Sequence, residues 1–115
     1  MDELILTEPT AENYYYRAQF HSQLDNYAQA LVDFDKALSL DAQTFEVWFS
    51  RALTYIAIKK YSEAVSDLTI ALQLNPESGK ALAARGFARW RLRDFKNAEE
   101  DFTNCKQQNN RFSIR

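Results

Sequence analysis

The chain has 115 residues, of which 46% are hydrophobic, and a formal net charge of −2 at pH 7. A chain of this length forms one domain, and a charge near zero favours neither nucleic acid nor an anionic membrane surface as its partner. With 2 Gly, 2 Pro and 1 Cys, the composition also excludes a turn-rich β barrel, an internal disulfide and a cysteine-based zinc site. Because no apolar run reaches the length of a membrane span, we expect a soluble, largely helical domain of the cytoplasm.

Six helices are expected in chain order. Apolar residues recur at steps of three and four positions, which is the spacing of one helix face. The pattern predicts an N-terminal extension at 1–10 and then helices at 11–24, 28–41, 45–58, 62–75, 79–92 and 96–108. Thr10, Thr44 and Ser78 directly precede the first, third and fifth helices, where a side-chain hydroxyl can accept a hydrogen bond from a free N–H of the first turn.

The six helices form three units that repeat every 34 residues without insertion or deletion. Five columns of residues keep this spacing: Tyr14, Trp48 and Leu82; Ala18, Ala52 and Gly86; Tyr27, Tyr61 and Phe95; Ala30, Ala64 and Ala98; and Phe34, Leu68 and Phe102. One pair of helices cannot bury its apolar face alone, so neighbouring units must stack into a continuous core. We therefore expect the aromatic side chains of these columns to be packing residues.

These columns resemble the tetratricopeptide repeat family, which has an aromatic, a small residue, a turn aromatic and an Ala at fixed positions of each unit. The resemblance covers almost the whole chain and implies an all-α fold, a right-handed α-solenoid of three antiparallel helix pairs. It places a single domain at 11–110, with repeats 11–44, 45–78 and 79–112 and a tail at 113–115. The family's turn glycine is replaced by Asp25, Lys59 or Arg93, a departure that we do not expect to disturb the fold.

The second helix of the last unit departs from its counterparts. Glu99, Lys106 and Gln108 occupy columns that are apolar in the first two units. Terminal units of a repeat protein need a polar outer face. We therefore interpret this helix as the physical end of the stack, and the chain as a complete module of three repeats.

Each unit also contains an Arg that is followed 16 residues later by an Asp: Arg17 and Asp33, Arg51 and Asp67, and Arg85 and Asp101. One interpretation is a ladder of charges that binds a ligand. The other is a structural ion pair between two helices, formed three times. We prefer the structural interpretation, because the partners occur in matched sets beside the packing columns.

The sequence lacks the groups of a catalytic site. His21 is the only His and occupies a column at the edge of the packing, and Cys105 is the only Cys and occupies a column of small residues. Neither has a second ligand at metal-binding spacing, and Gly79 and Gly86 cannot form a glycine-rich phosphate loop. We therefore expect no enzymatic activity, no metal and no cofactor.

The family resemblance implies one known way of binding a ligand. A clamp of two Lys, two Asn and one Arg holds the carboxylates of chaperone C-terminal tails. Carried over column by column, the five clamp positions are Tyr15, Gln19, Ser50, Lys80 and Ala84. Only Lys80 keeps its residue type, so the sequence disfavours such a tail as the partner.

The resemblance also places a concave groove along the first helix of each unit. The predicted lining is apolar and aromatic in the centre and charged at the rim: Tyr15, Gln19, Glu46, Phe49, Ser50, Leu53, Ile56, Lys80, Ala83, Phe87, Trp90 and Arg91. Its aromatic and aliphatic members lie outside the packing columns, so the core does not account for them. Such a patch is typical of a protein-interaction site, and the expected partner is a peptide or an amphipathic helix of another protein.

The charges are divided unequally along the chain. Residues 1–78 contain 5 Lys/Arg and 12 Asp/Glu, whereas residues 79–115 contain 9 and 4. A partner of opposite polarity, head-to-tail stacking of copies and a small nucleic-acid patch around Trp90 would each fit this division. Nucleic acid is disfavoured, because most of the surface would repel phosphate. The preferred interpretation is a protein-interaction module or adaptor, and the alternative is a homo-oligomeric scaffold that stacks through the groove or the oppositely charged ends.

Overall fold

The computed structural model describes residues 8–40 and 43–113, with side chains as far as Asn109. This part of the chain contains no strand and six helices: α2 (Ala11–Gln23), α3 (Tyr27–Ser39), α4 (Phe45–Ala57), α5 (Tyr61–Leu74), α6 (Gly79–Arg91) and α7 (Phe95–Ser113). The all-α prediction is confirmed, and only the last helix differs from its predicted range by more than two residues, because it continues five residues further. Most of the predicted extension (1–7) and most of the tail (114–115) lie outside the described residues.

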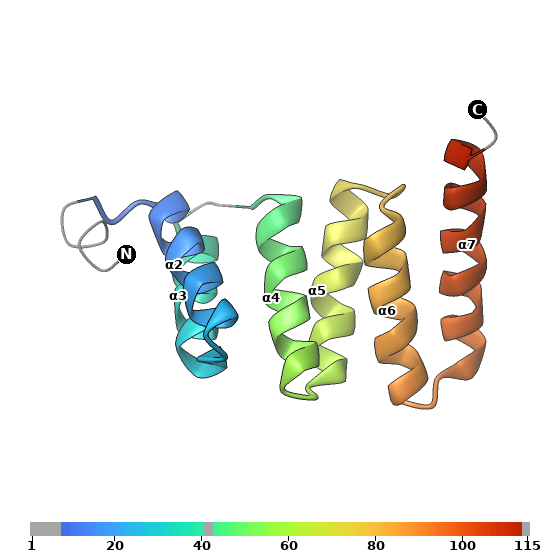
Figure 1. Cartoon of the computed structure of the whole chain (residues 1–115), viewed down its shortest axis with the longest axis horizontal. Coiled ribbons are helices and arrows are strands. Elements are labelled where there is room, and N and C mark those ends of the chain that lie inside the picture. Colours follow the sequence, from blue (N-terminus) through green and yellow to red (C-terminus); the bar gives the residue numbers. More distant parts are fainter. Residues whose placement is uncertain (1–7, 41–42, 114–115) are drawn as a thin grey trace.

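The helices stand side by side as three antiparallel pairs, from α2 and α3 at one end to α6 and α7 at the other (Figure 1). Contacts are made within each pair, and between pairs through α3 with α4 and α5 with α6. The first helices of the pairs also contact each other, α2 with α4 and α4 with α6. The molecule is therefore an open row of 46 × 33 × 22 Å, in which α2, α4 and α6 form one layer that contains every predicted groove residue. None of the described helices combines the length and the apolar character needed to cross a membrane.

Two clusters of buried residues hold the row together, and each extends into the following unit. The first cluster contains Ala18, Ala30, Phe34, Ala37, Leu38 and Val47. The second contains Ala52, Ala64, Leu68, Leu72, Ala81, Leu82 and Ala88. The last member of the first cluster belongs to α4, and the last three members of the second belong to α6. Neither of the first two helix pairs therefore completes its core without the pair that follows.

Each helix pair is joined by the same tight turn. In all three turns the backbone N–H two positions after the C-cap donates to a carbonyl five residues earlier, at 2.8–2.9 Å. This closure is a Schellman motif, which requires a residue with positive φ directly before the donor. Asp25, Lys59 and Arg93 occupy that position, with φ of 61°, 64° and 65°. The turn therefore keeps its geometry although none of the three residues is Gly.

Two of the three predicted N-caps form. The side-chain oxygens of Thr10 and Ser78 each accept a hydrogen bond from the backbone N–H three residues later, at 3.2 Å. The prediction for Thr44 is wrong, because its side chain makes no capping hydrogen bond although its backbone has the extended conformation of an N-cap. Only the carbonyl of Thr44 takes part, accepting from the N–H of Trp48 at 3.3 Å. Packing against the first cluster thus has to hold the start of α4.

The prediction that every aromatic column member is a packing residue holds only in part at the C-terminal end of the row, where the Phe102 ring packs against Gly86 of α6 but is not covered on its other side. Phe34 and Leu68 are 1% and 0% exposed, whereas Phe102 in the same column is 43% exposed. Phe95 is also 53% exposed. The reason is position, because the next helix pair covers Phe34 and Leu68 and no described helix lies beyond α7. This end is therefore partly aromatic rather than polar throughout.

Candidate functional site

The charged columns meet between the two helices of each unit. Every Arg donates two hydrogen bonds, at 2.7–3.0 Å, to the two carboxylate oxygens of the Asp 16 residues later: Arg17 to Asp33, Arg51 to Asp67 and Arg85 to Asp101. The three Asp are 0–3% exposed. The hydrogen bond to Asp67 raises the pKa of Arg51 above its ordinary value, so this cation keeps its charge. Buried and occupied on both oxygens, the carboxylates face the partner helix and not the groove.

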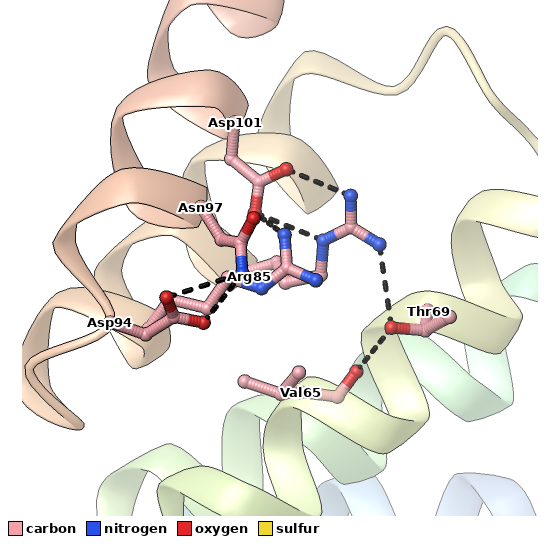
Figure 2. Close-up of polar contacts among 7 residues, drawn as sticks. Val65, Thr69, Arg85, Asp94, Asn97 and Asp101 are labelled. Atoms are coloured by element: carbon pink, nitrogen blue, oxygen red, sulfur yellow. Dashed lines mark hydrogen bonds and ion pairs between the residues drawn. The ribbon is translucent and has the colours of Figure 1, made fainter.

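A second set of contacts links neighbouring units, and the sequence reasoning missed it. Arg51 also donates to Oδ1 of Asp35 on α3 at 2.7 Å. Arg85 donates in the same way to Oγ1 of Thr69 on α5 at 3.3 Å, and Thr69 in turn donates to the carbonyl of Val65 at 2.8 Å (Figure 2). The signal was present, since Asp35 and Thr69 are 34 residues apart and each precedes its Arg by 16.

The single His and the single Cys both make structural contacts. His21 Nε2 lies 3.9 Å from Oδ2 of Asp33, where the third unit has Arg89 donating to Oδ2 of Asp101 at 2.9 Å. Cys105 Sγ donates to a backbone carbonyl of α6 at 3.3 Å. Within the described ranges no group of three or more His, Cys, Asp or Glu could hold a metal ion.

The N-terminal part of the predicted groove is polar, and its side chains bond to each other. Gln19 Nε2 donates to Oη of Tyr15 at 2.9 Å, and this Oη lies 3.5 Å from Oγ of Ser50 on α4. An open hollow of about 150 Å³ follows, lined by Gln19, Ser22, Gln23, Phe34, Ser50 and Leu53. The structure thus brings the predicted residues of α2 and α4 together across one shallow surface.

The central part contains two stacked rings with a cation over them. Phe45 and Phe49 stack with ring centroids 5.4 Å apart and planes within 12°. Lys80 Nζ lies 5.0 Å from the centroid of Phe49 and 5.9 Å from that of Phe45. Such a cation–π contact stabilises by about 0.5–1 kcal/mol at an exposed site. Ala83, one turn further along α6, is half-buried.

The C-terminal part presents exposed apolar side chains. Leu53, Phe87 and Trp90 are 43%, 38% and 50% exposed. The Phe87 ring lies 6.2 Å from that of Trp90 and 6.1 Å, edge-on, from that of Tyr61. The guanidinium of Arg91 lies 5.2 Å from the Tyr61 ring. Three large apolar side chains of α4 and α6, Leu53, Phe87 and Trp90, are thus open to solvent on the groove layer.

The premise that the core does not account for the apolar groove residues is wrong for three of them. Tyr15 packs against the first buried cluster, and Phe49 and Ile56 pack against the second. The side chains of the first helices reach into the space between neighbouring pairs, and sequence spacing alone does not distinguish that space from the groove surface. Leu53, Phe87 and Trp90 are therefore the stronger candidates for contact with a partner.

The two ends of the groove differ in charge. An open hollow of about 240 Å³ at the start of α4 is lined by Glu46 and Glu12 together with polar and aromatic neighbours. A second hollow of about 250 Å³, at the turn between α6 and α7, is lined by Arg91 and Arg93 together with Trp90 and Phe95. The groove layer therefore runs from an acidic to a basic end.

A family model described as Tetratricopeptide repeat matches residues 11–44 and 45–78, which together make up more than half of the chain. The chain belongs to the tetratricopeptide repeat (TPR) family. TPR units are in general protein-interaction modules rather than enzymes.

Solved TPR structures align with most of this chain. The second TPR of Spaghetti (RPAP3), bound to the HSP90 peptide SRMEEVD, is 27% identical with a TM-score of 0.81, over 92% of this chain and 98% of that one. The first TPR domain of human RPAP3 is 25% identical with a TM-score of 0.78, over 86% and 78%. MamA is 16% identical with a TM-score of 0.89, over 97% and 66%, and supports the fold alone. No curated protein sequence matches the chain significantly.

Proposed function

We propose that this TPR domain is an adaptor that captures an apolar or aromatic segment of a partner protein along α2, α4 and α6. One observation carries the proposal, the exposure of Leu53, Phe87 and Trp90 on a single layer of helices. The segment is an extended peptide or an amphipathic helix, since both insert apolar side chains into a groove. Aromatic anchors of this kind supply much of the energy at protein interfaces.

The comparison with Spaghetti supports a peptide partner but not the same peptide chemistry. SRMEEVD contains three acidic residues, which need cations or other donors to bind them. At the corresponding positions of this chain, Gln19 bonds to Tyr15, Lys80 lies over two aromatic rings, and Ala84 has no polar group. The lining therefore favours an apolar segment over an acidic tail.

Charge supports one orientation of the bound segment. Glu12 and Glu46 lie at the N-terminal end of the groove, and Arg91 and Arg93 lie at the C-terminal end. A segment with a basic residue on the α2 side and an acidic residue on the α6 side would be complementary to both. Such rim charges act mainly on specificity and on the association rate.

A peptide-display selection on the immobilised wild-type domain tests the proposal. We expect the enriched peptides to contain aromatic or aliphatic residues at helix or strand spacing. Their affinity, measured by isothermal titration calorimetry, should fall about tenfold or more in the double variant Leu53→Ser, Phe87→Ser. The reason is that each buried anchor contributes on the order of 1–2 kcal/mol.

A matched control removes equally exposed apolar side chains from the other layer. Val32 on α3 and Leu74 on α5 are 56% and 51% exposed, and the double variant Val32→Ser, Leu74→Ser should bind the selected peptides as the wild type does. The peptide SRMEEVD should give no saturable binding. The proposal fails if the groove variant keeps full affinity, or if the selected peptides require a free C-terminal carboxylate.

A further inference from the structure

The two ends of the row carry exposed aromatic side chains. On α2, Tyr16 and Phe20 are 49% and 46% exposed, and they lie four residues apart on one helix face. At the other end, Trp90, Phe95 and Phe102 are 50%, 53% and 43% exposed. Trp90 lies where the groove meets this end, and Tyr16 also lines the hollow with Glu12 and Glu46 at the acidic end of the groove. Phe20, Phe95 and Phe102 lie outside the predicted groove.

The face of α2 that carries Tyr16 and Phe20 is covered in the other two units. The column of Tyr16 continues as Ser50 and Ala84, and the column of Phe20 continues as Thr54 and Ala88. Thr54 and Ala88 are 2% and 0% exposed, because the preceding helix pair packs over them. Within the row, this helix face carries small side chains and is covered. At the N-terminal end of the row, the same face of α2 carries large aromatic side chains and is open to solvent.

One contact inside the row indicates what Phe20 would meet. The hydroxyl of Thr54 lies 3.4 Å from the hydroxyl of Ser22 in the preceding unit. Thr54 is in the column of Phe20, and Ser22 is in the column of Trp90. If a second copy continued the row beyond α7 in the same register, its Phe20 would therefore face Trp90 of the first copy.

A second contact gives the neighbouring pair, in which a large side chain meets a small one. Within the row, the small Ser50 lies 3.5 Å from the large Tyr15 of the preceding unit. Ser50 is in the column of Tyr16, and Tyr15 is in the column of Ala83. Between two copies the sizes are reversed, so that the large Tyr16 faces the small Ala83. Within the row the preceding unit supplies the large side chain, and between two copies the following copy supplies it. The contact therefore still joins one large and one small side chain.

The C-terminal end also has room for an aromatic ring. An open, mainly apolar hollow of about 440 Å³ is lined by Trp90, Phe95, Ala98 and Phe102, with Glu99 and Lys106 at its edge. Burial of one Phe or Tyr side chain in such a hollow removes roughly 150–250 Å² of surface from water.

The charges of the two ends are opposite. Residues 8–40 contain five Asp/Glu and two Lys/Arg, whereas residues 79–109 contain seven Lys/Arg and four Asp/Glu. The α2 end of one copy is therefore attracted to the α7 end of another, and like ends repel each other. This selects head-to-tail contact over symmetric contact between two identical ends.

We propose that copies of this chain dock head to tail, with Tyr16 and Phe20 of one copy against the α6–α7 end of the next. The two surfaces of such a contact are different, so each docked pair keeps one free face at either end, and the row can continue to grow. The docking contact shares Trp90 and Ala83 with the predicted groove, whereas Leu53 and Phe87 take no part in it, so variants at Leu53 separate this proposal from partner capture.

Light scattering on the wild-type chain and on two end variants tests the proposal. The weight-average mass of the wild type should rise with concentration past two chains, one chain being 13.4 kDa. Phe20→Arg blocks the α2 face and Trp90→Arg blocks the α7 end, because each places an unpaired cation in an apolar contact. Each variant alone should remain a monomer at concentrations where the wild type exceeds two chains.

An equimolar mixture of the two variants gives the sharpest result. Phe20→Arg keeps an intact α7 end and Trp90→Arg keeps an intact α2 face, so one productive contact is possible. The mixture should therefore form a complex of two chains and grow no further. A symmetric interface would instead be recognised by a wild-type mass that stops at two chains.

Two further sets of variants separate the contact from folding and from the groove. Leu53→Ser should assemble as the wild type does. Tyr16→Arg and Ala83→Arg block the neighbouring contact and replace any first variant that loses its helical circular dichroism. The proposal is overturned if the wild type stays monomeric up to about 1 mM, if its mass stops at two chains, or if the mixture stays monomeric.

Discussion

At the scale of single residues, the three turns within the helix pairs hold side chains in a backbone region that favours glycine. Lys59 and Arg93 have φ of 64° and 65°, and Asp25 has φ of 61°. The left-handed conformation costs a residue with a Cβ atom roughly 1–2 kcal/mol and is readily adopted by Gly. Asp tolerates this region better, because its short polar side chain bonds locally. The hydrogen bonds of each turn therefore maintain a small backbone strain.

Lys59→Gly should relieve this strain and raise the free energy of unfolding by about 1 kcal/mol. Urea denaturation measures the change. Arg93→Gly should give a similar gain, and Asp25→Gly a smaller one. Lys60→Gly is the control, since Lys60 has φ of −94° and gains nothing from Gly. A Lys59→Gly variant no more stable than Lys60→Gly would contradict the account.

At the scale of helices, one Arg makes two contacts that differ in burial. Arg51 bonds to Asp67 within its own unit and to Asp35 of the preceding unit, both at 2.7–2.8 Å. The side chain of Asp67 is 5% exposed and that of Asp35 is 60% exposed. The spacing of 16 residues predicted Asp67 as a partner, because two antiparallel helices joined by a short turn bring such residues opposite each other, but it did not predict the contact with Asp35. Burial depends on the neighbouring helices, and no spacing reveals it.

We expect the buried partner to dominate stability. Asp67→Ala removes the buried carboxylate and leaves Arg51 only its exposed partner Asp35, and it should cost about 3 kcal/mol. Asp35→Ala removes an exposed partner of the same Arg and should cost about 0–1 kcal/mol. Guanidinium denaturation measures the free energy of unfolding of the two variants. Equal decreases would contradict the expectation that the buried partner of Arg51 contributes more to stability than the exposed one.

At the scale of the whole molecule, the row of helix pairs has no single hydrophobic core. Each helix pair contacts only the pairs beside it, so its stability is the sum of its own packing and that of its junctions. Of the described pairs, only the central one, α4 with α5, has a neighbour on both sides. The two outer pairs each have one open face, and these faces carry most of the exposed aromatic residues, whereas Phe87 lies in the groove layer.

Native-state hydrogen exchange should therefore show a gradient of protection. Amides of α4 and α5 should exchange most slowly, and those of α2 and α7 most rapidly, because opening an end pair breaks only one junction. The measurement belongs at low protein concentration, where head-to-tail contacts do not cover the ends. Equal protection of all six helices would mean that the row opens only as one unit.

The 34-residue period, the three helix pairs, the positions of the turns and the matched Arg and Asp columns could all be predicted from the sequence. These features follow from spacing, and spacing is repeated identically in each unit. The sequence also assigned the candidate groove residues to the first helix of each pair. It did not show which other side chains surround them.

Which members of a column are covered depends on the packing of the helices and could not be predicted from the spacing. The tertiary structure packs Tyr15, Phe49 and Ile56 against the buried clusters, and it leaves Phe102 open where Phe34 is covered. The physical reason is that exposure belongs to a junction between units and not to a position within a unit. Equivalent residues therefore have different surroundings in the middle of the row and at its ends.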